Sequence, residues 1–286
     1  MSKLSVPGTL AGLVCAGAAL WFVPLSAQQK SAVPDFMQDR DGAWLMIGDE
    51  LLPPPSGGPG PITFDKRHPY VDNRAARQTR SQPTYRVADL TNPILQPWVR
   101  EELKKANDRV LAGKVPFRAR ERCYPSGVPS WVVYTLAEPI VIIQSAKEVT
   151  MVNYGGPEVR RIYLDVPHSE HVTPSWYGES VGHYENGDTL VVDTIGQSTK
   201  TYVDPYLTPH TDRLHVVERY KLTQGGKMID VAITVDDPGA FTTPWSAVQR
   251  FRRIPHEFTE DICAENNFDF LKYEVVPLPQ ASKPDF

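Results

Sequence analysis

The feature that most constrains this chain is a run of short segments, from residue 130 onward, in which apolar and polar residues alternate. A period of two places alternate side chains on opposite faces of a β-strand. No long stretch of helical periodicity separates these segments, so parallel strands joined by helices are not expected. The predicted strands are Trp131–Leu136, Ile140–Ser145, Glu148–Tyr154, Val159–Asp165, Ser180–Tyr184, Thr189–Thr194, Leu214–Leu222, Met228–Val235, Ala247–Ile254 and Phe258–Ile262.

Turn residues divide this run into hairpins. Asn186-Gly187 is typical of a type I′ turn, because both residues tolerate a positive φ. Gly225-Gly226 indicates a second hairpin. About nine or ten short antiparallel strands predict a mainly β fold, either a barrel or a strongly curled sandwich. Closing a barrel also removes the exposed edges that so many strands would leave.

The first 28 residues have the composition of a signal peptide. Lys3 supplies a positive charge, an apolar run covers residues 10–23, and small residues precede Gln28. Glycines interrupt the apolar run, which is short for a membrane span, so a retained N-terminal anchor is the alternative. We therefore expect a periplasmic or secreted protein, which would contact a membrane only through an uncleaved N-terminal segment.

Two further regions precede the strands. Residues 29–96 are rich in Pro and Gly and predict an irregular arm. Pro97 to Gly113 predicts one helix, because Pro suits its first position and Gly its end. This helix and the strands would form one domain over residues 97–286.

Composition excludes several classes of function. The formal net charge is −4 and no basic stripe is present, so nucleic-acid binding has no electrostatic support. Phosphate loops and dinucleotide fingerprints are missing. No cofactor is implied.

Two cysteines, Cys123 and Cys263, lie outside the signal segment. In an exported chain they suggest a single disulfide, and two unrelated buried thiols are the alternative. Neither belongs to a Cys-x-x-Cys pair, so redox catalysis and a cysteine-based zinc site are not indicated.

One predicted strand carries a carboxylate in an apolar row. Glu218 shares its face with Leu214, Val216, Tyr220 and Leu222. Burying a carboxylate is costly unless it is paired, and the expected partner is Arg161 or Arg219. Glu218 could be a barrel-lining acid with a raised pKa, or part of a structural ion pair, or on an outward face.

Histidines form two clusters in the chain. His168 and His171 lie between predicted strands, and His210 and His215 flank the start of another. Their spacing is not that of a metal site. A His/carboxylate acid–base pair, with Asp193 or Glu218 orienting an imidazole, is the enzymatic reading, and hydrogen bonding within loops is the structural one.

Aromatic residues indicate a cavity or a filled core. A barrel of this strand number can be plugged by side chains or can hold one small ligand. The candidates for ligand contact are Arg161, Tyr163, His168, Trp176 and Tyr220, while Trp131, Tyr184 and Trp245 belong to the same aromatic set.

Several motifs together resemble a family of secreted bacterial β-rich proteins of uncharacterised function. They include Trp176-Tyr-Gly-Glu-Ser-Val-Gly182, Gly187-Asp-Thr-Leu-Val-Val-Asp-Thr194 and His215-Val-Val-Glu-Arg219. The resemblance covers about residues 120 to 270 and suggests a calycin-like barrel. It also implies that Cys123 pairs with Cys263, because both motifs that surround them resemble the family pattern. It implies no reaction.

Three functions follow as hypotheses. The first is an exported barrel that binds a small apolar or aromatic ligand in its cavity. The second is an isomerase, lyase or hydrolase that uses His215 or His210 with Asp193 or Glu218, while Arg161 holds an anionic group. The third is a cell-envelope interaction module whose Pro-rich arm contacts a partner.

Overall fold

A computed structural model describes residues 33–37, 42–81, 84–114, 123–133, 139–153 and 158–255. The expected signal peptide, the strand expected at Phe258–Ile262 and Cys263 lie outside these residues. Among the described residues, no helix is both long and apolar enough to cross a membrane.

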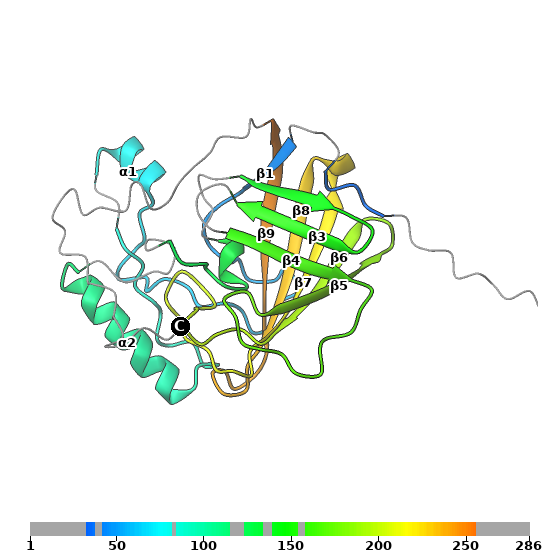
Figure 1. The fold of residues 1–286 in the computed structure, drawn as a ribbon. Helices are drawn as coiled ribbons and strands as arrows, with labels where there is room; N and C mark the ends of the chain where they lie inside the picture. Colours follow the sequence, from blue (N-terminus) through cyan, green and yellow to red (C-terminus); the bar gives the residue numbers. More distant parts are fainter. Residues whose placement is uncertain are drawn as a thin grey trace, which may run out of the picture. The chain divides into compact units, whose positions relative to one another are not determined.

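Nine strands form a closed barrel, in which each strand pairs with its neighbour in sequence and β1 pairs with β9 (Figure 1). Inside and outside residues alternate regularly, as in β4, where every second residue is buried. The strands are β1 Gly42–Met46, β2 Ile140–Gln144, β3 Glu148–Asn153, β4 Glu158–Leu164, β5 Glu179–Glu185, β6 Thr189–Ile195, β7 His215–Thr223, β8 Met228–Asp236 and β9 Trp245–Pro255.

One pair of strands corrects the expectation of an all-antiparallel sheet. β4 and β5 run parallel, with Tyr163 opposite Val181 and Leu164 opposite Gly182. Parallel neighbours need a connection that returns the chain to the same end of the sheet. Residues 165–178 make that return without a helix, and the barrel is therefore mixed.

The first strand arises where an irregular arm was expected. β1 pairs with β9 along its whole length and meets β2 at Trp44 and Ile140. Trp44 is buried, so this short segment closes the barrel as well as filling it. The expectation of an irregular arm was wrong for these residues, because five residues between Pro- and Gly-rich stretches give too little alternation to detect.

The rest of the described arm is held against the barrel domain by polar contacts. Arg86 is buried and binds Asp49 and Glu50, each at 2.6 Å. Tyr206, from the loop before β7, donates a hydrogen bond of 2.8 Å to Glu50. The short helix α1, Asn73–Thr79, begins at Asp72, whose side chain accepts a hydrogen bond from the amide of Ala75.

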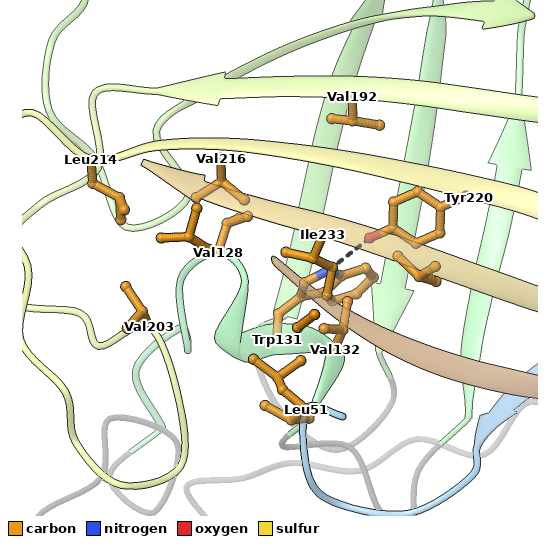
Figure 2. Packing of buried hydrophobic residues seen from close by; sticks show 14 of the residues in the cluster. Leu51, Val128, Trp131, Val132, Val192, Val203, Leu214, Val216, Tyr220 and Ile233 are labelled. Atoms are coloured by element: carbon orange, nitrogen blue, oxygen red, sulfur yellow. Dashed lines mark hydrogen bonds between the residues drawn. The ribbon is translucent and has the colours of Figure 1, made fainter. Parts of the chain in front are cut away.

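A strand predicted at Trp131–Leu136 is wrong for its described part. Ser130–Val132 is a 3-10 helix, η2. Its apolar residues are buried in one contiguous core with those of the strands, and Trp131 lies beside Tyr220 and Ile233 (Figure 2). A run of apolar residues looks the same whether it is a buried strand or a buried turn, which explains the error.

Helix α2 occupies Pro97–Leu111, within the range in which a helix was predicted. Val99 and Leu103 are buried. Asn107 binds the backbone N–H and C=O of Ala88 at 2.7 and 2.9 Å, which fixes the helix against the preceding segment.

Both predicted turns occur. Asn186 and Gly187 have φ values of 53° and 73°, as a type I′ turn requires, and join β5 to β6. A single 3-10 turn, η3 at Gln224–Gly226, joins β7 to β8.

Candidate functional site

The candidate site residues are separated by strand alternation into an inner and an outer group. Glu218 and Tyr220 of β7 point inward and are buried. His215 lies on the same strand, and its side chain remains 41 % exposed. The polar residues that sequence reading considered together therefore belong to two different environments.

The inner group is centred on Arg160 and Glu218, whose side chains are both 0 % exposed. Arg160 Nη2 lies 2.5 Å from Glu218 Oε2 and 2.9 Å from Thr194 Oγ1. Arg160 also contacts Ser180 Oγ, at 3.3 Å from Nη2. The carboxylate is thus paired, as its burial requires.

The expected partners of Glu218 were wrong. Arg161 and Arg219 both point outward and pair with Glu148 and Glu185. Because neighbouring residues on a strand face opposite sides, the correct arginine is one position before Arg161. The alternation of buried residues in β4 contains this information.

Two aromatic residues complete the inner group. Tyr220 donates a hydrogen bond of 2.7 Å to Glu218 Oε1, and Trp131 Nε1 donates one of 3.3 Å to Tyr220 (Figure 2). Burial raises the pKa of Tyr220 well above its ordinary value of 10, and the charge of Glu218 adds to this. Burial opposes the charge on Arg160, but the nearby carboxylate outweighs it and raises the pKa of Arg160. Tyr220 and Arg160 therefore keep their protons near neutral pH.

The outer group is centred on His168, which lies in the connection between β4 and β5 and contacts β5 and β6. Its Nδ1 lies 2.9 Å from Glu179 Oε1 and its Nε2 lies 2.9 Å from Asp193 Oδ1. His215 Nε2 also lies 2.9 Å from Asp193 Oδ1. We call these four residues, Glu179, His168, Asp193 and His215, the histidine clasp.

The pKa values of Glu179, Asp193 and His215 shift in the directions expected for ion pairs. Hydrogen bonding to Asp193 raises the pKa of His215, and the bond from His215 is the main reason that the pKa of Asp193 is lowered. Hydrogen bonds from the Ser169 hydroxyl and amide lower the pKa of Glu179. Both carboxylates therefore remain ionised near neutral pH.

A hollow of about 440 Å³ lies beside the clasp. Arg161, Tyr163, His171, Tyr177 and Glu179 contribute to its lining, together with Val159, Val172, Thr173, Gly178 and Ser180. Glu179 therefore belongs to both the hollow and the clasp. Sequence reading selected Arg161 and Tyr163 but missed Glu179, whose Trp-Tyr-Gly-Glu context gives no chemical signal by itself.

The guanidinium of Arg161, which lines the hollow, is already paired with a carboxylate. Arg161 binds Glu148 through two hydrogen bonds of 2.9 and 2.7 Å, and this pairing lowers the pKa of Glu148 to about 2. The Arg161 guanidinium lies 5.3 Å from the centre of the Tyr163 ring. The wall at this point is a neutralised ion pair beside an exposed aromatic ring.

The candidate residues His210 and Trp176 do not belong to the inner group or the clasp. His210 is buried, with its ring nitrogens 2.8 Å from the Thr201 hydroxyl and 2.8 Å from the Thr211 carbonyl oxygen, and burial lowers its pKa. Trp176 stacks on Tyr124 with 5.0 Å between ring centres. Neither His210 nor Trp176 contacts the clasp through a hydrogen bond among the described residues.

Within the described part of the chain, no group of three or more His, Cys, Asp and Glu side chains is arranged to hold a metal ion. Cys123 is described but Cys263 is not, so the predicted disulfide stays a prediction.

Neither a protein-family model nor a curated protein matches the chain. The nine-stranded barrel is compatible with a calycin-like architecture. The resemblance to a secreted bacterial family stays a prediction.

Proposed function

We propose that this chain is an exported barrel protein that binds a small, neutral, aromatic molecule in the hollow on the outside of β4 and β5. The observation that carries the proposal is the hollow itself, whose volume of about 440 Å³ lies within the range of small-molecule sites. Two tyrosines and two valines line it, together with Arg161, His171, Thr173, Glu179 and Ser180.

A ligand site on the outside of the barrel is favoured over one in the barrel interior, which the sequence predicts. Trp131 and Tyr220 lie inside the barrel and hydrogen bond to each other, and Arg160 uses its donors on neighbouring residues. A ligand placed there would have to displace a satisfied polar network, which is costly. Tyr220 therefore serves the core in this proposal.

The pairing of Arg161 supports a neutral ligand. Its charge is matched by Glu148, so an anionic ligand would have to compete with two existing hydrogen bonds. The exposed ring of Tyr163 offers a surface on which an aromatic ligand can pack. His171 and Thr173 also line the hollow and carry hydrogen-bonding groups.

Ligand-observed NMR with neutral aromatic fragments, indole among them, tests this proposal. Tyr163→Ala should weaken the binding of fragments by about tenfold, because it removes the packing surface. Tyr85→Ala is the matched control, since Tyr85 is similarly exposed and does not line the hollow. Equal binding by all three proteins would refute the outer site.

Catalysis is the second candidate, and the Asp193–His215 pair favours it. Asp193 fixes one imidazole nitrogen of His215, as the carboxylate does in many acid–base pairs, and the other nitrogen has no hydrogen-bond partner among the described residues. His215→Gln distinguishes the two candidates. Loss of turnover with retained fragment affinity would support an enzyme, while unchanged affinity without any turnover in the wild type would support binding alone.

Export is proposed on the N-terminal sequence alone. The mature chain should begin near Gln28, and N-terminal sequencing of protein from the periplasm or medium tests this. An intact Met1 on cytoplasmic protein would contradict it.

A further inference from the structure

Residues 166–174, within the connection between β4 and β5, are fixed to the barrel at few points, whereas Ser175 after them is held by backbone hydrogen bonds with Gly196 and Ser198. From Val166 to Pro174, the hydrogen bonds that the connection makes to the rest of the described chain come from His168 and Ser169 alone. The same connection supplies His171, Val172 and Thr173 to the wall of the hollow. The position of this wall therefore depends on the histidine clasp.

The clasp requires more protons than a neutral imidazole carries. Both ring nitrogens of His168 face carboxylate oxygens, which are acceptors when ionised. A neutral imidazole has one N–H and can donate to Glu179 or to Asp193, while its other nitrogen would place a lone pair against a negative charge. Only the imidazolium form donates to both carboxylates.

Charged groups face His168 from neighbouring strands of the barrel. Glu179 faces it from β5 and Asp193 from β6. From β7, His215 shares the same Asp193 oxygen, and Asp236 of β8 lies opposite His215 in the sheet. Asp193 raises the pKa of His215, and Glu179 and Asp193 each place a carboxylate oxygen against a ring nitrogen of His168.

We propose that His168 is a proton-dependent latch for the hollow, which holds residues 166–174 against the barrel when it is protonated and releases them when it is neutral. The latch regulates the site described above, and its effect on ligands rests on that proposed function. Histidine changes charge near neutral pH, so the hollow would be closed and preformed in mildly acid solution and looser in mildly alkaline solution.

Amide hydrogen exchange of the full chain tests the latch without any ligand. The Ser169 amide donates to Glu179 Oε1 at 2.8 Å and reports closure directly. After correction for intrinsic exchange rates, its protection in the wild type should be about tenfold higher at about pH 5.5 than at about pH 8.5. Nitrogen-resolved NMR of the imidazole should find protons on both nitrogens of His168 at the lower pH.

Two variants separate the role of the proton from a merely structural role. His168→Gln should have low protection at both pH values. Asp193→Asn should remain protected at both, because an amide NH2 in place of Oδ1 can donate to both imidazoles in their neutral forms. Retention of the pH dependence in Asp193→Asn would overturn the proposal, even if His168→Gln fails to fold.

His183, a histidine outside the clasp, provides a control for the latch. His183 contacts one carboxylate, that of Glu185, through one ring nitrogen at 2.9 Å. A neutral imidazole satisfies that contact, so His183→Gln should leave the pH dependence of Ser169 protection unchanged. Loss of the dependence in this variant would show that the effect does not come from the clasp.

Indole, which stays neutral over this pH range, distinguishes failure of the latch from failure of the site. Tighter binding of indole at about pH 5.5 in the wild type, and equal binding at both pH values in Asp193→Asn, would support the coupling. A pH-dependent Ser169 amide with no indole binding would retain the latch and refute the proposed function. Indole binding with a pH-independent Ser169 amide would refute the latch alone.

Discussion

The inner Arg160–Glu218 group and the outer histidine clasp use similar residue types with opposite consequences. In the inner group, each carboxylate oxygen of Glu218 has its own donor, one from Arg160 and one from Tyr220. In the clasp, two imidazoles share one oxygen of Asp193. Matched donors and acceptors inside the barrel therefore fix a structure, whereas unmatched ones at the surface depend on protons.

The inner group and the clasp also differ in their exposure to solvent. Arg160 and Glu218 are inaccessible to water, so loss of either partner leaves a buried charge. Asp193 and His215 keep 38 % and 41 % of their side chains exposed, so water can replace a lost partner. Stability should therefore depend on the inner group, and responses to pH should depend on the outer one.

The largest expected effect comes from breaking the inner pair. Arg160→Met should lower the free energy of unfolding by about 3–5 kcal/mol, because Glu218 would remain buried without its cation. Urea denaturation measures this. Arg161→Met is the matched control on the same strand and should cost no more than about 1 kcal/mol, since Arg161 is exposed.

A double variant tests whether the loss in Arg160→Met comes from the unpaired charge of Glu218. Arg160→Met combined with Glu218→Leu should recover most of the loss, because an apolar pair of similar volume replaces the charges. If the double variant is as unstable as Arg160→Met, lost packing and not an unpaired charge explains the single variant.

A smaller effect is expected from the aromatic neighbour of the inner group. Trp131→Phe should cost about 2 kcal/mol, because it removes the N–H that donates to Tyr220 and leaves part of the space unfilled. Thermal unfolding measures this loss. No change in stability would mean that Trp131 does not pack inside the barrel.

The smallest effect, and the one that depends most on pH, belongs to the clasp. Asp193 raises the pKa of His215 above its ordinary value of 6.5, so the folded state binds this proton more tightly than the unfolded state. The resulting stabilisation is fully present below about pH 6.5 and is lost as the pH rises through the raised pKa. Removing the proton-binding group removes this dependence.

Comparing His215→Gln with the wild type measures this contribution. The difference in unfolding free energy should be under about 1 kcal/mol at pH 6 and should disappear by about pH 8.5. His171→Gln is the control, because His171 makes no hydrogen bond to another described residue, and it should show no such trend. A difference that grows with pH would contradict the assigned sign.

Sequence patterns predicted a barrel or a curled sandwich because the relevant information is local. Alternation in β4 and β8, and the positive φ tolerated by Asn186 and Gly187, depend on neighbouring residues alone. Patterns failed at Gly42–Met46 and at Ser130–Val132, where short apolar segments take their conformation from the barrel that they close or fill.

The candidate site likewise has features that local sequence predicts and features that depend on tertiary contacts. The residues alone place Glu218 in an apolar row and make His168, Asp193 and His215 candidate site residues. The pairing of Arg160 with Glu218, the place of Glu179 in the clasp and the position of the hollow outside the barrel follow from the tertiary structure. Strand register and the return of residues 165–178 bring these groups together, and a one-residue difference in register moves a side chain to the opposite face.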